Sequence, residues 1–98
     1  MNLQQFKDSL KDDSPPAGLS LALQAMWQDA NGDWQAAHKL AQDDGSPIGA
    51  WVHAYLHRVE GDLPNAAHWY TRAGKPRSDA PLEAEWESIV AALLGVGE

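Results

Sequence analysis

Two histidines in the second half of the chain have a spacing suited to metal binding. His53 and His57 are four residues apart, so in a helix both imidazoles share one face and can bind the same metal ion. Glu60 adds a carboxylate one turn further on, and His68 on the next predicted helix could complete such a site. The sequence contains neither HExxH nor ExxH, the usual helical metal motifs. A metal site at His53, His57 and Glu60 is therefore one interpretation, and a solvated polar helix face is the other.

Two arginines in the same region have the chemistry of an anion site. The planar guanidinium groups of Arg58 and Arg72 match carboxylate or phosphate oxygens. The alternative is ion pairing within the chain, with Glu83, Glu87 or Asp62 as partners. The candidate binding residues of the whole region are His53, His57, Arg58, Glu60, Asn65, His68, Trp69 and Arg72.

An earlier segment repeats this pattern without its titratable groups. A shift of 29 residues places QAMWQDANGD (24–33) on HAYLHRVEGD (53–62). The places of the two histidines and the glutamate are then taken by Gln24, Gln28 and Asn31. This face is polar in both copies, which favours an outward orientation, but only the second copy carries imidazoles.

The histidine at position 68 has a counterpart in the first copy. His38 and His68 each follow an Ala-Ala pair, in AAHKLA (36–41) and AAHWYT (66–71). A shared role in the architecture is the simpler explanation for both histidines, while His68 stays among the candidate binding residues.

Capping signals divide the chain into six helices. Ser-Pro at 14–15 and 46–47 and Asp-Ala-Pro at 79–81 place a capping side chain before a proline in the first turn. Gly-Asp at 32–33 and 61–62 is typical of a hairpin corner, with glycine ending one helix and aspartate capping the next. No stretch alternates with period two, so we predict no strands. The predicted fold class is all-α, with helices near 2–12, 15–30, 33–43, 47–60, 63–73 and 80–94.

Apolar positions of the last three helices define the predicted core. We expect burial of Trp51, Val52, Tyr55, Leu56, Val59, Leu63, Ala66, Ala67, Tyr70, Leu82, Trp86, Ile89, Val90 and Leu93. The five tryptophans are expected to be packing anchors inside the fold. On the helix near 47–60, His53, His57 and Glu60 lie on the arc opposite the apolar one, so we predict that they face outward.

Small and aromatic residues recur at fixed places around the second corner: Ala50-Trp51, Gly61-Asp62, Ala66, Trp69-Tyr70, Ala73 and Pro76. Over residues 19–77 this pattern resembles tetratricopeptide (TPR)-type repeats, although the copies are 29 or 30 residues apart rather than 34. The resemblance implies one 1–98 domain with two tandem TPR-like αα-hairpins (14–44 and 46–76), flanking N- and C-terminal helices, and a C-terminal cap over 79–95. The run HAYLHRVEGDLPNAAHWYTRAG is also similar to a motif of small uncharacterised microbial proteins, a resemblance that implies no activity.

Charge and composition exclude several classes of function. The net charge is −7, which argues against binding nucleic acid. Residues 45–77 nevertheless carry four basic and two acidic side chains, so this part of the chain can attract a small anion or an acidic peptide, or equally well form a docking surface for the acidic C-terminal helix. The absence of cysteine excludes disulfides and thiolate metal sites. The start MNLQQFKDSL has no signal-peptide pattern and no stretch is long enough to span a membrane, so we expect a soluble cytoplasmic protein.

These observations favour a small non-enzymatic interaction module that binds a peptide, a protein partner or its own copy as a homodimer. We expect no catalytic residues and no cofactor. The alternative is a small-molecule, anion or metal site, catalytic in one version, on the face of His53, His57, Glu60 and Arg72.

Overall fold

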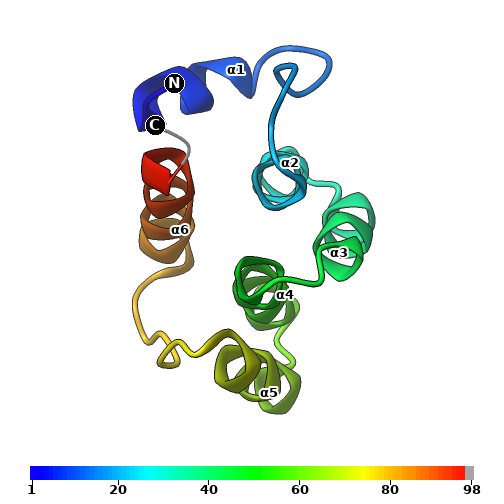
Figure 1. The fold of residues 1–98 in the computed structure, drawn as a ribbon, viewed down its shortest axis with the longest axis vertical. Helices are drawn as coiled ribbons and strands as arrows, with labels where there is room; N and C mark the ends of the chain where they lie inside the picture. Colours follow the sequence, from blue (N-terminus) through cyan, green and yellow to red (C-terminus); the bar gives the residue numbers. More distant parts are fainter. Residues whose placement is uncertain (97–98) are drawn as a thin grey trace.

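The computed structural model describes residues 1–96, and over these residues it contains six α-helices and no strand (Figure 1). The predicted all-α class is confirmed. Residues 97–98 of the predicted 1–98 domain lie outside the described residues. Within residues 1–96, no helix has both the length and the apolar character needed to cross a bilayer. The helices are α1 (Leu3–Ser9), α2 (Leu21–Ala30), α3 (Trp34–Asp43), α4 (Pro47–Val59), α5 (Leu63–Ala73) and α6 (Leu82–Val96).

The two Gly-Asp corners have the same local geometry. Gly32 and Gly61 have φ of 84° and 85°, a left-handed conformation that favours glycine. The aspartate that follows each glycine caps the next helix: Asp33 accepts from the backbone N–H of Ala36 at 3.0 Å, and Asp62 accepts from that of Asn65 at 3.2 Å. Both predicted caps are confirmed, and the sequence copies at 24–33 and 53–62 therefore encode equivalent corners.

The predicted start of the second helix at residue 15 is wrong. Helix α2 begins at Leu21, and its N-cap is Ser20, whose hydroxyl accepts from the backbone N–H of Leu23 at 3.2 Å. Consecutive prolines explain the late start, because the residue before a proline is disfavoured in the helical region. Gly18, with φ of 83°, then keeps the segment out of a right-handed helix.

The two terminal helices also differ from the predicted boundaries. Helix α1 ends at Ser9 rather than near residue 12, and α6 begins at Leu82, after the proline that was expected inside its first turn. The hydroxyl of Ser78 accepts from the backbone N–H of Ala80 at 3.2 Å and holds the turn before α6. By contrast, the predicted Ser-Pro start of α4 is confirmed, with Ser46 as the N-cap.

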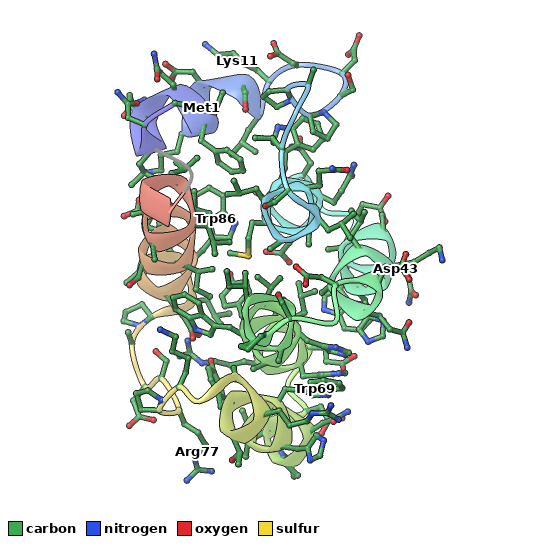
Figure 2. The ribbon with its side chains drawn as sticks, in the orientation of Figure 1. Met1, Lys11, Asp43, Trp69, Arg77 and Trp86 are labelled. Atoms are coloured by element: carbon green, nitrogen blue, oxygen red, sulfur yellow. The ribbon has the colours of Figure 1, made fainter. Side chains whose placement is uncertain are left out.

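The main core is formed by buried side chains of α1, α2, α3, α4 and α6, and a smaller cluster lies between α4 and α5. Helix α2 packs on α3 and α4 packs on α5, while α6 contacts α1, α2 and α4 (Figure 1). Trp86 points from α6 toward α2 and donates its indole N–H to the backbone oxygen of Met26 at 3.1 Å (Figure 2). The largest fully buried side chains are Phe6, Met26, Val52, Leu56, Ile89 and Val90.

Some predicted core residues are exposed. Leu63 is 60% exposed and Leu82 is 40% exposed, because each lies at the first position of its helix, where no neighbouring helix covers it. The prediction that all five tryptophans lie inside is also wrong. Trp27 and Trp86 are buried, but three tryptophans are only partly buried: Trp34, Trp51 and Trp69.

Candidate functional site

His53 and His57 are buried, which contradicts the prediction that they face outward. Their exposed fractions are 4% and 6%. The reason is that α3 packs against the polar side of α4. Trp34 at the start of α3 holds this contact by donating its indole N–H to the backbone oxygen of Leu56 at 2.8 Å.

Three of the four histidines form one cluster between two tryptophans. The Nε2 atoms of His38, on α3, and His53, on α4, are 3.0 Å apart. The rings of His53 and His57 are stacked at 4.8 Å between centroids. Trp69 stacks on the other face of His53 at 3.9 Å, and Trp34 stacks on His38 at 4.8 Å. We refer to His38, His53 and His57 as the histidine cluster.

The surroundings of His38 and His53 keep these two imidazoles neutral at pH 7. Burial lowers the pKa of His53 to about 4, and the charges of the neighbouring histidines act in the same direction. Burial also lowers the pKa of His38. Two neutral imidazoles 3.0 Å apart form a hydrogen bond when one Nε2 carries a proton and the other accepts it.

Glu60 fixes the orientation of His57. Its carboxylate Oε1 lies 2.6 Å from Nδ1 of His57, so the ring donates a proton from Nδ1. The other nitrogen, Nε2, is then the one with the lone pair in the neutral ring. Glu60 therefore belongs to the site as the hydrogen-bond partner of a cluster histidine.

His38 replaces His68 as the third member of the cluster. His38 was expected to have a role in the architecture and was not among the candidate site residues, whereas it contributes Nε2 to the centre of the cluster. Its sequence signal is Trp34, four residues earlier and hence on the same helix face. His68 is exposed and contacts Trp69 edge-on, with 5.4 Å between centroids. Asn65 is half-buried in the first turn of α5, where its backbone N–H donates to the cap.

Arg58 is part of a buried structural network on another side of α4. Its Nη1 lies 2.7 Å from Glu85 Oε1, and its Nη2 donates to the backbone oxygen of Ala80. The hydroxyl of Tyr70 donates to the second oxygen of the Glu85 carboxylate. Burial and this hydrogen bond raise the pKa of Tyr70. The last helix does supply the acidic partner, but the partner is Glu85 and not Glu83, Glu87 or Asp62, so this network ties α4, α5 and α6 together.

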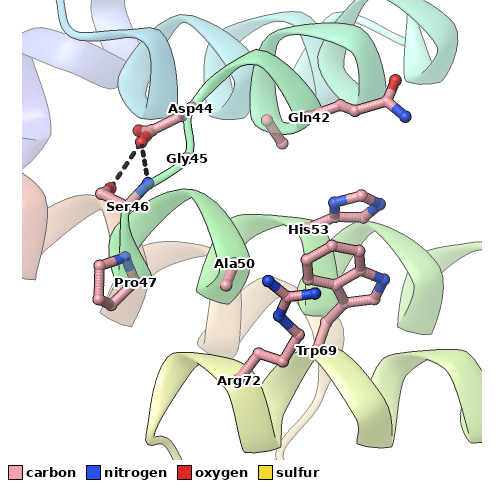
Figure 3. Close-up of a pocket in the computed structure, with 10 residues that line it drawn as sticks. Gln42, Asp44, Gly45, Ser46, Pro47, Ala50, His53, Trp69 and Arg72 are labelled. Atoms are coloured by element: carbon pink, nitrogen blue, oxygen red, sulfur yellow. Dashed lines mark hydrogen bonds between the residues drawn. The ribbon is translucent and has the colours of Figure 1, made fainter.

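A cleft of about 260 Å³ opens next to the cluster, between the end of α3 and helices α4 and α5 (Figure 3). His53 and Trp69 line it, and the guanidinium carbon of Arg72 lies 5.0 Å from the Trp69 ring centroid (Figure 3). Asp44 also lines the cleft, but its carboxylate accepts from the backbone N–H and hydroxyl of Ser46, at 2.9 and 2.6 Å. The cleft therefore combines an aromatic surface with an exposed cation.

The residues with the best geometry for a metal are the three cluster histidines. One ring nitrogen from each lies within 4.8 Å of those of the other two. His57, Glu60 and Asp62 form a second group with ligand atoms within the same distance. In this group the Asp62 carboxylate is already engaged as the N-cap of α5, so the group is the weaker candidate for a metal.

Comparison with known proteins finds no protein-family model that matches the chain, no significantly similar curated protein and no significantly similar solved structure.

Proposed function

We propose that the chain is a non-enzymatic interaction module that binds an acidic peptide segment of another protein in the cleft of Trp69 and Arg72. The observation that carries the proposal is the guanidinium of Arg72 over the Trp69 ring at the edge of this cleft. The guanidinium carbon lies 5.0 Å from the ring centroid, and the N–H groups of the exposed side chain remain able to donate to a carboxylate.

The charge of the region supports an acidic ligand. No carboxylate within residues 1–96 forms an ion pair with Arg72. In the surrounding segment, residues 45–77, Arg58 is paired with Glu85, which leaves three exposed basic side chains against two acidic ones in a chain of net charge −7. An acidic peptide is attracted to this segment and repelled by the rest of the surface.

The size and chemistry of the cleft support a peptide side chain as the occupant. At about 260 Å³ the cleft is smaller than a usual cofactor or substrate pocket, which takes roughly 300–1,000 Å³. The cleft is lined by one hydroxyl group, that of Ser46, which donates to the Asp44 carboxylate and accepts from the backbone at the start of α4. It therefore has no histidine partner of the kind that activates a serine nucleophile. A TPR-like arrangement of the hairpins, which stays a prediction, fits the same role, because such repeats present extended binding surfaces.

The proposal is tested with a peptide array. The array displays acidic ten-residue peptides beside copies in which every Asp and Glu is replaced by Asn or Gln. We expect the full chain to bind a subset of the acidic peptides and none of their amide copies, with affinity that falls as salt is added. Arg72→Gln should lower the affinity at least tenfold.

The matched control is Arg77→Gln, which removes the same charge from an exposed residue that projects away from the fold (Figure 2). It should leave the affinity within about twofold, since only the general charge attraction changes. Equal binding of acidic and amide peptides, or equal losses in the two variants, would contradict the proposal. A concentration-dependent dimer abolished by Arg72→Gln would also contradict it, since it would assign the cleft to a second copy.

A further inference from the structure

We infer that His38, His53 and His57 form a binding site for a divalent transition-metal ion, with Zn²⁺ as the expected occupant. This inference is separate from peptide binding, because it rests on the histidine cluster and not on Arg72. The sequence pointed to a metal site made of His53, His57 and Glu60; the structure places His38 in the ligand set and moves Glu60 to a supporting role.

The distances in the cluster are close to those of a metal centre. Nitrogens bound to a tetrahedral Zn²⁺ at about 2.0–2.1 Å are about 3.3 Å from each other. The Nε2 atoms of His38 and His53 are 3.0 Å apart, and the three ligand nitrogens lie within 4.8 Å of one another. Changes in these distances of a few tenths of an ångström to about 1.5 Å bring all three nitrogens to bonding distance.

The hydrogen bond between two of the rings does not block a metal. A metal ion binds the lone pair of a ring nitrogen, and the Nε2 atoms of His38 and His53 share one proton. On binding, the proton shared by the two Nε2 atoms moves to Nδ1 of the ring that carried it, leaving both lone pairs for the metal.

Supporting residues hold the rings in place. The Glu60 carboxylate accepts from Nδ1 of His57 at 2.6 Å, the carboxylate–histidine arrangement that orients a metal-binding ring and increases its basicity. Trp69 and Trp34 stack on His53 and His38 and limit their rotation. The ligands are thus positioned before the metal arrives, which lowers the entropy cost of binding.

The donor set selects the class of metal. Three imidazole nitrogens suit Zn²⁺, Cu²⁺, Ni²⁺ and Co²⁺, whereas Mg²⁺ and Ca²⁺ need oxygen ligands. Three protein ligands leave a fourth position for water or another small ligand, as in open zinc sites. We therefore expect binding of Zn²⁺ and Co²⁺ and no binding of Mg²⁺.

The test is calorimetric titration of ZnCl₂ into the full, tag-free, chelator-treated protein at pH 7.5, with MgCl₂ as the comparison ion. We expect one Zn²⁺ per chain and a visible absorption spectrum typical of four-coordinate Co²⁺ when CoCl₂ is used. The variants His38→Gln, His53→Gln and His57→Gln should each weaken Zn²⁺ binding at least tenfold. Glu60→Gln should weaken it by a smaller factor, because only the orientation of His57 is affected.

The chain contains its own matched control, because His68 is the one histidine outside the cluster. His68→Gln should leave the Zn²⁺ affinity within about twofold. An absence of Zn²⁺ binding by the wild type, or an equal loss in His68→Gln, would overturn the inference. If circular dichroism shows that a cluster variant does not fold, the site is tested by ¹⁵N NMR of the wild-type imidazoles. Addition of Zn²⁺ should shift the ring-nitrogen resonances of His38, His53 and His57 and leave those of His68 unchanged. Shifts at His68 alone, or at no histidine, would refute the site.

Discussion

Acidification should destabilise the metal-free protein through His53. Burial lowers the pKa of this imidazole to about 4, whereas the unfolded chain has a value of about 6.5. Between these two values the unfolded state binds a proton that the folded state does not. The free energy of unfolding contributed by the neutral ring is therefore fully present above pH 6.5 and is lost as the pH falls through this window.

The size of the effect follows from the two pKa values. Inside the window the slope is about 1.36 kcal/mol per pH unit, which integrates to a loss of roughly 2 kcal/mol at pH 5 and roughly 3 kcal/mol at pH 4, relative to pH 7. A domain of this size has a total stability of about 5–15 kcal/mol, so the loss is large without unfolding the protein by itself.

The assay is urea denaturation at several pH values between 4.5 and 7.5, in EDTA, for the wild type and His53→Gln. The acidic residues of the chain titrate in both proteins, so the difference between the two pH profiles isolates the imidazole. We expect the variant to lose about 2 kcal/mol less than the wild type between pH 7 and pH 5. Parallel pH profiles, or an NMR titration that gives His53 a pKa near 6.5, would refute the burial of this ring.

Two further predictions concern packing. Gly49→Ala should destabilise the protein by about 1–3 kcal/mol in chemical denaturation, because a Cβ there would lie 2.2 Å from the backbone oxygen of Asp44. Gly95→Ala, in a helix with open space around this residue, should instead stabilise the protein by about 0.5–1 kcal/mol. If both substitutions changed the free energy of unfolding in the same direction, the close approach at Gly49 would be contradicted. Glu85→Gln should lower the free energy of unfolding by about 3 kcal/mol, since it leaves the largely buried Arg58 guanidinium without its charged partner. Glu83→Gln, at an exposed position of the same helix, should change it by less than about 0.5 kcal/mol. Similar losses of stability in the two variants would rule out the buried network.

The local structure of this chain is well encoded by short sequence signals. The Gly-Asp corners and the Ser-Pro start of α4 were predictable because a left-handed glycine and a capping side chain act on the four or five residues around them. The start of α2 was missed where two such signals conflict. A serine followed by proline favours a helix start, but a second proline and Gly18 oppose it.

The candidate site was only partly predictable, because burial depends on contacts between helices. The pattern of α4 assigns His53 and His57 to a polar face, and a polar face is usually solvated. Here α3 covers that face with Trp34 and His38, so the imidazoles pack and hydrogen bond like other buried side chains. No periodicity within α4 contains this information. The nearest signal was the Trp34–His38 pair, whose spacing places an aromatic ring and an imidazole on one face of α3.

Arg58 and Arg72 illustrate the same distinction. Both have the chemistry of an anion site, but Arg58 lies against Glu85 in the interior while Arg72 stays exposed over Trp69. Only the packing of α6 on α4 separates the structural arginine from the candidate binding arginine.

The convergence of three imidazoles between Trp34 and Trp69 is tested most directly by a crystal structure of the zinc-loaded protein with anomalous data collected at the zinc absorption edge. The expected result is one anomalous peak per chain, with ring nitrogens of His38, His53 and His57 at about 2.0–2.1 Å from it. A peak at His68 or at surface carboxylates, or histidine rings that point separately into solvent, would contradict the account.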